Sequence, residues 1–317
     1  MARNEKKVDL VKNAMPAFDR NKFLAGRQSP VFFGSAINNF GVREILNTLV
    51  ELAPSPGSRK ALQREVSPAE NKFSAVVFKI QANMDPAHRD RVAFLRICSG
   101  HFLRGMKLKI CRNGKEIRTN NALSFLSQRR DILDEAFPGD IIGLPNHGLL
   151  RLGDTLTEGE QLQFTGLPFF APEIFRMVES ADPLRSKQLR MGLMQLGEEG
   201  AIQVFRPMAG GTMLLGAFGQ LQFEVVSHRL QTEYGAEVRL LPARYNLARW
   251  VSSDDPVALK KFTQENIHRM AEDVVGASVF LASHKSELDV AQQRWESIQF
   301  HALREHAGLI YQSALAG

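Results

Sequence analysis

The sequence predicts a multidomain protein in which an α/β remnant is followed by an all-β barrel and then by an α+β domain with C-terminal helices. Three observations lead to this expectation. The length of 317 residues suits about two domains, or three small ones. The hydrophobic period changes twice along the chain. The composition, with 44% hydrophobic and 23% charged residues, is that of a folded globular protein.

Residues 1–57 carry the pattern of one strand and one helix. The apolar run Val31–Phe33 is typical of a strand buried on both faces. Apolar residues then recur at spacings of three and four over Val42–Leu52, which predicts an amphipathic helix. One strand and one helix are a slice of an α/β sheet, so we expect this segment to be loosely packed or to borrow a partner. Residues 58–71 are predicted to be a polar linker.

Between residues 72 and 160 the hydrophobic period is two. Leu108 and Ile110 alternate with polar neighbours, and the Asn113-Gly114 pair that follows predicts a hairpin turn. Further strands are expected at Phe73–Ile80, Val92–Ile97 and Asp140–Leu144. Short strands at close spacing predict a small β-barrel.

Residues 161–317 mix strands with helices in the order β-α-β-β-α-β, which is that of a split βαβ sandwich. The expected helices are Leu189–Leu196 and Phe223–Tyr234, and the expected strands include Ile202–Phe205, Met213–Leu215 and Val238–Leu241. A mainly helical C-terminal extension follows. Asp255-Pro256 predicts the start of a helix that continues to Met270, and Ser286 predicts the start of the last helix.

No segment predicts export or membrane insertion. The longest run without Asp, Glu, Lys or Arg, between Arg206 and Glu224, contains four glycines and is no membrane span. Cys98 and Cys111 are too few for a disulfide framework and suit a reducing compartment. We therefore expect a cytoplasmic protein with no membrane partner.

The sequence predicts no self-sufficient catalytic site and no metal site. It contains no GxxxxGK[ST] phosphate loop, no HExxH, no GxSxG and no paired CxxC. Asp140–Gly143 and Asp273–Gly276 match the short DxxG pattern of nucleotide hydrolases, but neither follows a phosphate loop. Chance explains both matches.

Positive charge is concentrated on the predicted hairpin. Lys and Arg outnumber Asp and Glu by 40 to 34, for a net charge of +6, which favours an anionic partner. The cations of interest are Arg89, Arg91, Arg104, Lys107, Lys109, Arg112, Lys115 and Arg118. A rigid hairpin carrying cations suits contacts with phosphates, which position a protein without recognising sequence. A solvated strand face is the alternative, and the absence of interleaved aromatic residues does not favour stacking on single strands.

Nearly the whole chain, from Val8 to His306, resembles the C-terminal part of bacterial peptide chain release factor three, a translational GTPase of the termination step. SPVFFGSAINNFGV at 29–42 is similar to the fifth guanine-nucleotide motif of that family. FKIQANMDPAHRDRVAFLRICSG at 78–100, EAFPGDIIGLPNHG at 135–148 and LGDTLTEGE at 152–160 resemble its second-domain barrel. QLGEEGAIQVFRP at 195–207 and GAFGQLQFEVVSHRL at 216–230 resemble its third domain.

The resemblance implies a translation-factor β-barrel followed by a split βαβ domain like the third domain of elongation factor G. In the family, the GTP-bound factor binds a ribosome that holds a stop-codon-reading release factor and promotes the departure of that factor. The implied partners are small-subunit RNA and protein, the stop-codon-reading factors indirectly, and no DNA. The cations named above become candidate ribosome contacts, and GTP, GDP and Mg are the implied cofactors of the intact family.

The sequence departs from the family pattern before the fifth motif. Gly34, Ser35 and Ala36 match the guanine-facing turn, but only about thirty residues precede it, and Asn21–Leu24 resembles NKxD without its carboxylate. A triphosphate needs a cradle of amides, a Lys and Mg²⁺, so we expect this chain alone neither to bind GTP tightly nor to hydrolyse it. The alternatives to a termination factor portion are a stand-alone, nucleotide-independent ribosome-binding regulator and an inactive truncated product.

Overall fold

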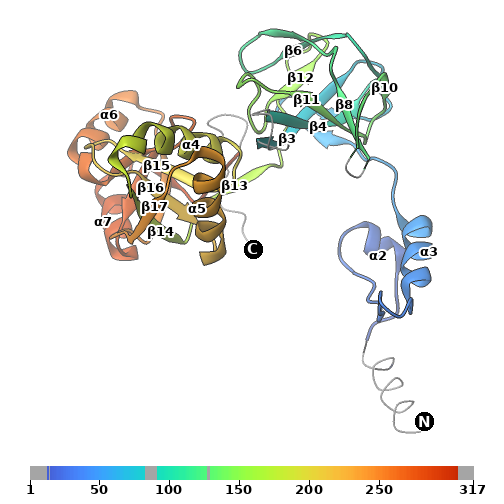
Figure 1. Ribbon diagram of the computed structural model, residues 1–317, viewed down its shortest axis with the longest axis horizontal. Coiled ribbons are helices and arrows are strands. Elements are labelled where there is room, and N and C mark those ends of the chain that lie inside the picture. The colour runs from blue at the N-terminus through green and yellow to red at the C-terminus, as the bar shows by residue number, and fades with distance from the viewer. Residues whose placement is uncertain (1–12, 14, 83–90, 127–128, 306–317) are drawn as a thin grey trace. The chain divides into compact units, whose positions relative to one another are not determined.

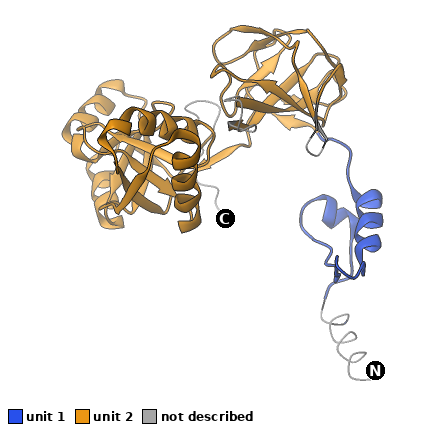
Figure 2. Cartoon of the chain, viewed as in Figure 1, with its two compact units in different colours: residues 1–57 blue, residues 58–317 orange. Residues whose placement is uncertain are grey.

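In the computed structural model, the described residues are 13, 15–82, 91–126 and 129–305. The chain divides into two units, residues 1–57 and residues 58–317, which Figure 2 shows in blue and orange. Figure 1 shows the helices and strands of each unit and labels many of them. Among the described residues, no helix is both long and apolar enough to cross a membrane.

The first unit contains the helices α2 (Arg20–Leu24) and α3 (Val42–Leu52). The Asp19 carboxylate caps α2 by accepting hydrogen bonds from the amides of Asn21 and Lys22. The helix predicted over 42–52 is formed, but neither helix contains a buried residue. The apolar side of α3 is therefore uncovered by the described part of this unit.

The strand predicted at Val31–Phe33 is not formed. The segment is irregular chain in which Val31 is 65% exposed and Phe33 is 78% exposed. The only pairing in the described part of this unit is one antiparallel bridge between Ser35 and Phe40. A strand needs a neighbouring backbone for its amides and carbonyls, and no described segment of this unit supplies one.

Residues 58–71 are not free chain. They contain an antiparallel hairpin of β1 (Arg59–Lys60) and β2 (Glu65–Val66). The guanidinium of Arg64 forms ion pairs with Glu70 and Glu160, each at 2.8 Å. Charged residues that suggest a solvated linker thus tie this segment to the end of the barrel.

The barrel is confirmed. Its strands are β3 (Ser74–Ala82), β4 (Arg91–Ser99), β5 (Phe102–Leu103), β6 (Lys107–Ile110), β7 (Glu116–Arg118), β8 (Leu123–Leu126), β9 (Arg129–Ile132), β10 (Glu135–Ala136), β11 (Ile141–Pro145) and β12 (Thr155–Thr157). The main sheet has the order β7-β6-β12-β3-β4-β11-β8-β9, and β10 pairs with β5. Leu95, Phe102, Leu108, Ile142 and Leu156 meet in one buried core. No ladder joins β7 to β9 within the described residues, so the sheet is open at that seam.

The split βαβ domain is also confirmed. Its elements are β14 (Ile174–Ser180), α4 (Ser186–Glu198), β15 (Gln203–Pro207), β16 (Leu214–Ala217), α5 (Gln220–Tyr234) and β17 (Val238–Pro242), with a short 3₁₀ turn, η1 (Pro183–Arg185), before α4. The strand order β17-β14-β16-β15 places the two crossover helices against one face of the sheet. Leu193 of α4 and Val226 of α5 pack there with Val204 and Leu215.

The expected helical extension is instead a second split βαβ unit. It consists of β18 (Leu247–Ser252), α6 (Pro256–Glu265), η2 (Ile267–Arg269), β19 (Met270–Glu272), β20 (Ser278–Ala282), α7 (Lys285–Arg294) and β21 (Gln299–His301). Its strand order, β19-β20-β18-β21, is that of the preceding βαβ domain read from the other end. The pairing of β15 with β19 joins these two βαβ units into one eight-stranded sheet. Two of the strands have only three residues, too few for a sequence period to reveal them.

Met270 lies in β19 and not on the helix that precedes it, and Ser286 lies inside α7 and does not cap it. The predicted start of α6 is confirmed, because Asp255 accepts a hydrogen bond from the Val257 amide at 2.8 Å with Pro256 in the first turn.

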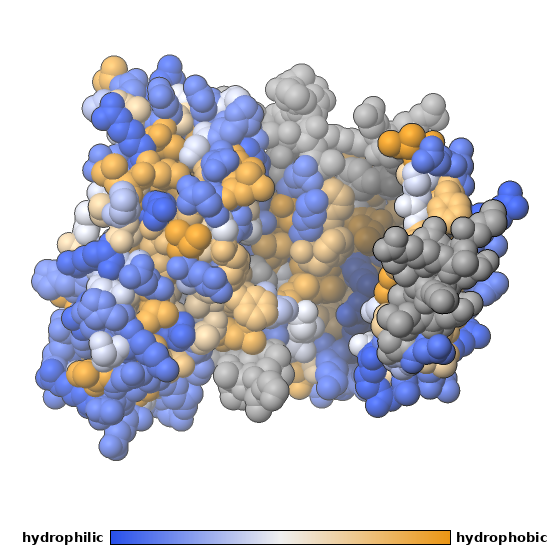
Figure 3. Space-filling model, turned by 90° about the horizontal axis from the view of Figure 1, so that it is seen from below, coloured by the Kyte–Doolittle hydropathy of each residue, from blue (hydrophilic) through white to orange (hydrophobic). Residues whose placement is uncertain are grey.

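The two βαβ units form the body at the left of Figure 3. On the face shown there, apolar side chains appear as separate small patches among polar ones.

A buried ion pair fixes the end of the described chain. β22 (Leu303–Glu305) pairs with β13 (Pro168–Phe170), and the buried Arg304 contacts Asp273 at 3.0 Å. The same carboxylate accepts a hydrogen bond from the Trp250 indole at 3.0 Å and from the amides of two residues that follow it. Asp273, from one of the two DxxG matches, is therefore a structural residue.

Candidate functional site

The predicted basic surface lies on the hairpin formed by β6 and β7. Lys107 pairs with Arg118 and Lys109 pairs with Glu116 across the two strands. Leu108 and Ile110 alternate with the lysines and are fully buried in the barrel core. Because successive side chains of a strand point to opposite faces, the cations share the outer face of the hairpin.

The turn of this hairpin is longer than the two-residue Asn-Gly turn that the sequence predicts. The Ile110 amide donates to the Lys115 carbonyl at 2.8 Å, and the Gly114 amide donates back to the Ile110 carbonyl at 2.8 Å. Gly114 has a φ of 71°, a conformation that glycine adopts without strain. The Asn113 side chain accepts a hydrogen bond from the Lys115 amide at 3.1 Å, so the turn holds Lys115 at its end.

Arg112 has a structural partner. Its guanidinium binds the Asp154 carboxylate through two hydrogen bonds, of 2.6 and 3.0 Å, and donates to the Leu149 carbonyl at 3.1 Å. The Asp154 side chain is only 2% exposed. The hydrogen bonds that Arg112 donates to Asp154 hold the pKa of Arg112 above its usual range. Arg112 thus anchors the hairpin to the loop before β12.

Arg104 lies beside the base of the hairpin, in the loop between β5 and β6. It donates to the Asn120 carbonyl at 3.0 Å and approaches the exposed Asp134 carboxylate at 3.4 Å. Its side chain is 47% exposed. Arg104 is consequently available to a ligand only in competition with Asp134.

The second predicted cationic loop contributes less. Arg89 lies outside the described residues. Arg91 is held by an ion pair with Glu198 of α4 at 3.0 Å, and its side chain is only 13% exposed. Nearby, Arg229 of α5 contacts Glu199 at 3.0 Å. Arg91 therefore belongs to an internal charge network more than to an open surface.

Four of the predicted cations remain open. Lys107, Lys109, Lys115 and Arg118 are exposed or half-buried, and none of them forms an ion pair with another described residue. We call these four residues the open basic face. The sequence predicted their common location, but only the structure separates them from Arg112 and Arg91.

A polar pocket beside the base of the hairpin contains residues that the sequence did not single out for function. Asn120 and Asn121 come from the loop after β7, and His147 comes from the loop after β11. These residues are distant in sequence, and asparagine is common in turns. No sequence signal distinguished them from ordinary turn residues.

The predicted guanine-facing turn is closed on itself. The Ser35 amide donates to the Phe40 carbonyl at 2.9 Å, and the Ser35 hydroxyl accepts a hydrogen bond from Asn38 at 3.1 Å. A Cβ atom added to Gly34 would lie 2.9 Å from the Phe40 carbonyl oxygen, so only glycine fits there. Together with Ala36, these residues form a compact turn that leads into α3.

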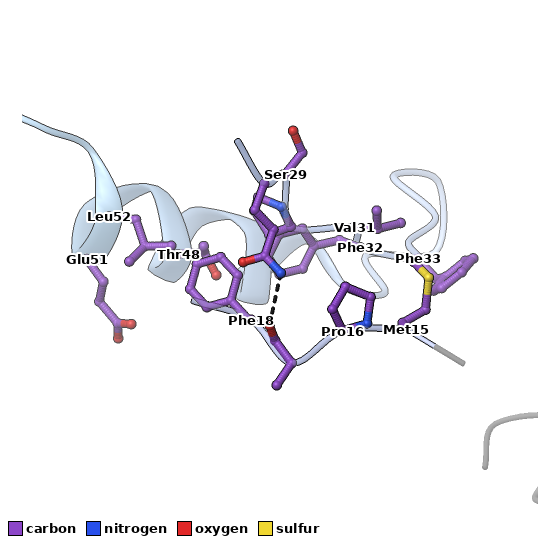
Figure 4. A pocket seen from close by; sticks show the side chains of 13 residues that line it. Met15, Pro16, Phe18, Ser29, Val31, Phe32, Phe33, Thr48, Glu51 and Leu52 are labelled. Atoms are coloured by element: carbon purple, nitrogen blue, oxygen red, sulfur yellow. Dashed lines mark hydrogen bonds between the residues drawn. The ribbon is translucent and has the colours of Figure 1, made fainter. Parts of the chain in front are cut away.

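The first unit also has an open apolar groove of about 630 Å³, shown in Figure 4. Its lining side chains include Met15 and Phe18, Val31 and Phe32, and Leu52 of α3. The Gln28 side-chain amide crosses it to donate to the Ala17 carbonyl at 2.9 Å. An exposed apolar surface of this kind is typical of an interface.

Two family models match the chain. Residues 164–292 match the model described as class II release factor RF3, C-terminal domain. Residues 72–159 match the model of elongation factor G domain 2. The first of these stretches contains the first βαβ domain and most of the second βαβ unit, up to part of α7, and the second stretch contains the barrel.

Curated relatives match almost the whole chain. It is 66% identical over 307 residues to a peptide chain release factor 3 of Nitrosomonas eutropha. This alignment covers 97% of this chain and 57% of the relative. It is 64% identical over 309 residues to that of Bordetella avium, covering 97% and 58%. The chain therefore spans little more than half the length of the curated relatives it matches, and the match is to their C-terminal portion.

A solved structure shares the fold. The crystal structure of a protein from Thermus thermophilus superposes with a TM-score of 0.53 at 23% identity, covering 69% of this chain and 31% of that chain. This likeness agrees with the predicted barrel and α+β architecture.

Proposed function

We propose that this chain, which belongs to the peptide chain release factor 3 family, docks on the ribosome in translation termination through the open basic face of its barrel. The observation that carries the proposal is a set of four cations on one hairpin, none paired with another described residue. The family relationship supplies the ribosome as the partner. The free charges supply a physical reason for binding.

The open basic face suits ribosomal RNA. Lysines two apart on a strand lie about 7 Å apart, and the anchored turn keeps Lys115 at a constant distance from them. Each cation that neutralises a phosphate releases a counterion, which makes binding salt-dependent. Small-subunit RNA, with its neighbouring protein, is the contact that we propose for Lys107, Lys109, Lys115 and Arg118.

The wider activity of the family is a proposal for this chain as well. In that activity the factor promotes the departure of a stop-codon-reading release factor, with GTP, GDP and Mg as cofactors. The residues of this chain do not fit a whole nucleotide, because the Ser35 amide and hydroxyl bond within their own turn and the sequence has no phosphate loop. We therefore propose no chemical step that involves GTP for these residues.

We propose a separate role for each of four segments of the chain. Residues 1–57 correspond to the end of a nucleotide-binding domain and 58–71 connect it to the barrel. Residues 72–160 form the docking barrel, and 161–317 form the α+β part. The match of the elongation factor G domain 2 model to 72–159 supports the third of these assignments.

A second function is favoured by the same basic face. Its cations lie on the β6–β7 hairpin of the barrel and not in the guanine-facing turn, so the chain can act as a nucleotide-independent ribosome-binding regulator. An inactive product with no ribosome affinity is the remaining alternative.

Co-sedimentation with small ribosomal subunits tests these proposals. We expect the wild-type chain to sediment with the subunits, and the variant K107A/K109A/R118A to bind at least tenfold more weakly. The slope of log affinity against log salt should fall by about two to three for three lost phosphate contacts. The control K187A/K260A/K285A removes the same charge from exposed positions of the α+β part.

Binding that is equal in both triple variants would reject the open basic face as the contact. Binding of the wild-type chain that does not change with GTP supports the regulator. No binding at any salt concentration supports the inactive product.

A further inference from the structure

The polar pocket beside the hairpin has a volume of about 280 Å³. Its floor is apolar, because Leu144 and Leu150 lie there and each is only 4% exposed. Its rim is polar and consists of Arg118, Asn120, Asn121 and His147. The volume is slightly below the range of small-molecule sites, which leaves room for one planar ring system.

The rim side chains are available to a ligand. All four are exposed, and within the described part of the chain none of them has a side-chain hydrogen bond or ion pair. Asn146 provides the contrast. Its side chain is buried and bound within its own loop, since it accepts hydrogen bonds from three amides and donates to the Leu150 carbonyl at 2.9 Å.

Both walls of the pocket are held by the fold. The Asn146 bonds fix the loop that carries His147. On the opposite wall, the Asn120 carbonyl accepts the hydrogen bond from Arg104 at 3.0 Å. The preceding residue, Thr119, donates from its hydroxyl to the Met106 carbonyl at 3.1 Å. The rim groups are thus presented on anchored backbone.

We propose that this pocket binds one unstacked nucleobase of RNA, with the adjoining phosphate on Arg118 and Lys107. A base needs apolar or aromatic contact on its faces and both donors and acceptors along its edge. Leu144, Leu150 and the imidazole of His147 supply the first, and the two asparagine amides supply the second. Arg118 lines the pocket, and Lys107 is its cross-strand neighbour, so a second positive charge lies beside the first.

This inference rests on the proposed docking to ribosomal RNA and makes it more specific. Lysine contacts to phosphates carry no base information. A base in the pocket would fix the register of the barrel on a looped or bulged RNA. Lys107, Lys109 and Lys115, the residues of the open basic face that do not line the pocket, need not distinguish one RNA segment from another.

Nuclear magnetic resonance titration tests the pocket without a ribosome. The probes are the four nucleoside 5′-monophosphates, and ribose 5-phosphate is the control that lacks a base. We expect every probe to shift signals of Lys107 and Arg118. Only the nucleotides should shift the side-chain amides of Asn120 and Asn121 and the ring of His147. Nucleotides and ribose 5-phosphate that perturb the same residues equally would overturn the inference.

Two variants separate the base from the phosphate. N121A/H147A changes only exposed side chains and should weaken nucleotide binding about tenfold while leaving ribose 5-phosphate binding unchanged. R118A should weaken both. If N121A/H147A binds nucleotides as well as the wild-type chain does, the pocket is not a base site.

Chemical probing of ribosomal subunits tests the pocket independently of the titration. In dimethyl sulfate probing of small subunits, the wild-type chain should protect a base that N121A/H147A leaves reactive at saturating protein. If the wild-type chain does not sediment with subunits, the docking proposal fails, and the titration still decides the pocket. If it sediments but the titration shows no base-dependent shifts, only the pocket inference fails.

Discussion

For single side chains, the decisive question is whether a carboxylate of the same chain already holds the cation. Arg112 and Lys109 lie three residues apart on one hairpin, and the sequence assigns them the same role. In the structure Arg112 binds the buried Asp154 through two hydrogen bonds, whereas Lys109 has no ion pair among the described residues. The two positions therefore contribute to different properties, stability in one case and binding in the other.

We expect Arg112→Ala to lower the free energy of unfolding of the barrel by about 2–4 kcal/mol, because it leaves the buried Asp154 carboxylate without its cationic partner. Lys109→Ala should change it by less than about 0.5 kcal/mol. Urea unfolding of the two variants measures the difference. Equal stability of both variants would show that the ion pair is dispensable.

The half-buried His301 should make the stability of the folded chain depend on pH. Burial lowers the pKa of its imidazole, and its Nε2 lies 2.7 Å from the Ser252 hydroxyl. An unfolded chain binds the proton first as pH falls through about 6.5, so protonation favours unfolding below that pH. His301→Gln should therefore lose less stability than the wild-type chain between about pH 7 and about pH 5. Thermal melting at the two pH values tests this, and parallel losses would contradict it.

Among the elements, the β6–β7 hairpin shows how backbone conformation supports a charged surface. Gly114 has a φ of 71°, and a Cβ atom there would meet nothing closer than the Lys109 Cε atom at 3.8 Å. The cost of a side chain at this position is thus backbone strain and not a clash. The turn presents Lys115, so its conformation affects the open basic face.

Gly114→Ala should destabilise the hairpin by about 1 kcal/mol and weaken binding to small subunits without any change of charge. Gly114→Asn is the matched control, because asparagine tolerates this conformation better than alanine. Amide exchange of β6 and β7 and co-sedimentation measure the two effects. An alanine variant that behaves like the asparagine variant would exclude a role for the turn conformation.

At the level of the complete chain, the two units differ in how much they bury. No residue of α2 or α3 is buried, and the groove next to α3 is lined by exposed apolar side chains. In the second unit, both the barrel and the eight-stranded sheet of the α+β part contain fully buried cores. Protection from exchange follows buried contacts, so the units should open with different free energies.

In a dilute monomer we expect the amides of α3 to exchange at least about 100-fold faster than those of β3 and β4. Hydrogen exchange followed by mass spectrometry compares them directly. Slow exchange in α3 at low concentration would mean that its apolar side is already covered.

Much of the architecture follows from local sequence patterns. Alternating residues such as Leu108 and Ile110 predict barrel strands, and Asp255-Pro256 predicts the start of α6. These signals are local because hydrogen bonding and side-chain direction repeat over a few residues. Motifs spread along the chain likewise identify the family.

Tertiary structure decided what depends on distant partners. Val31–Phe33 has the composition of a buried strand but no adjacent backbone to pair with among the described residues of its unit. β19 and β21 are too short to show a period, and they form strands because the sheet supplies neighbours. The division of the cations into Arg112 and the open basic face depends on Asp154, forty-two residues away. The pocket joins Asn121 to His147 only because the barrel brings two loops together, and a linear sequence does not record that proximity.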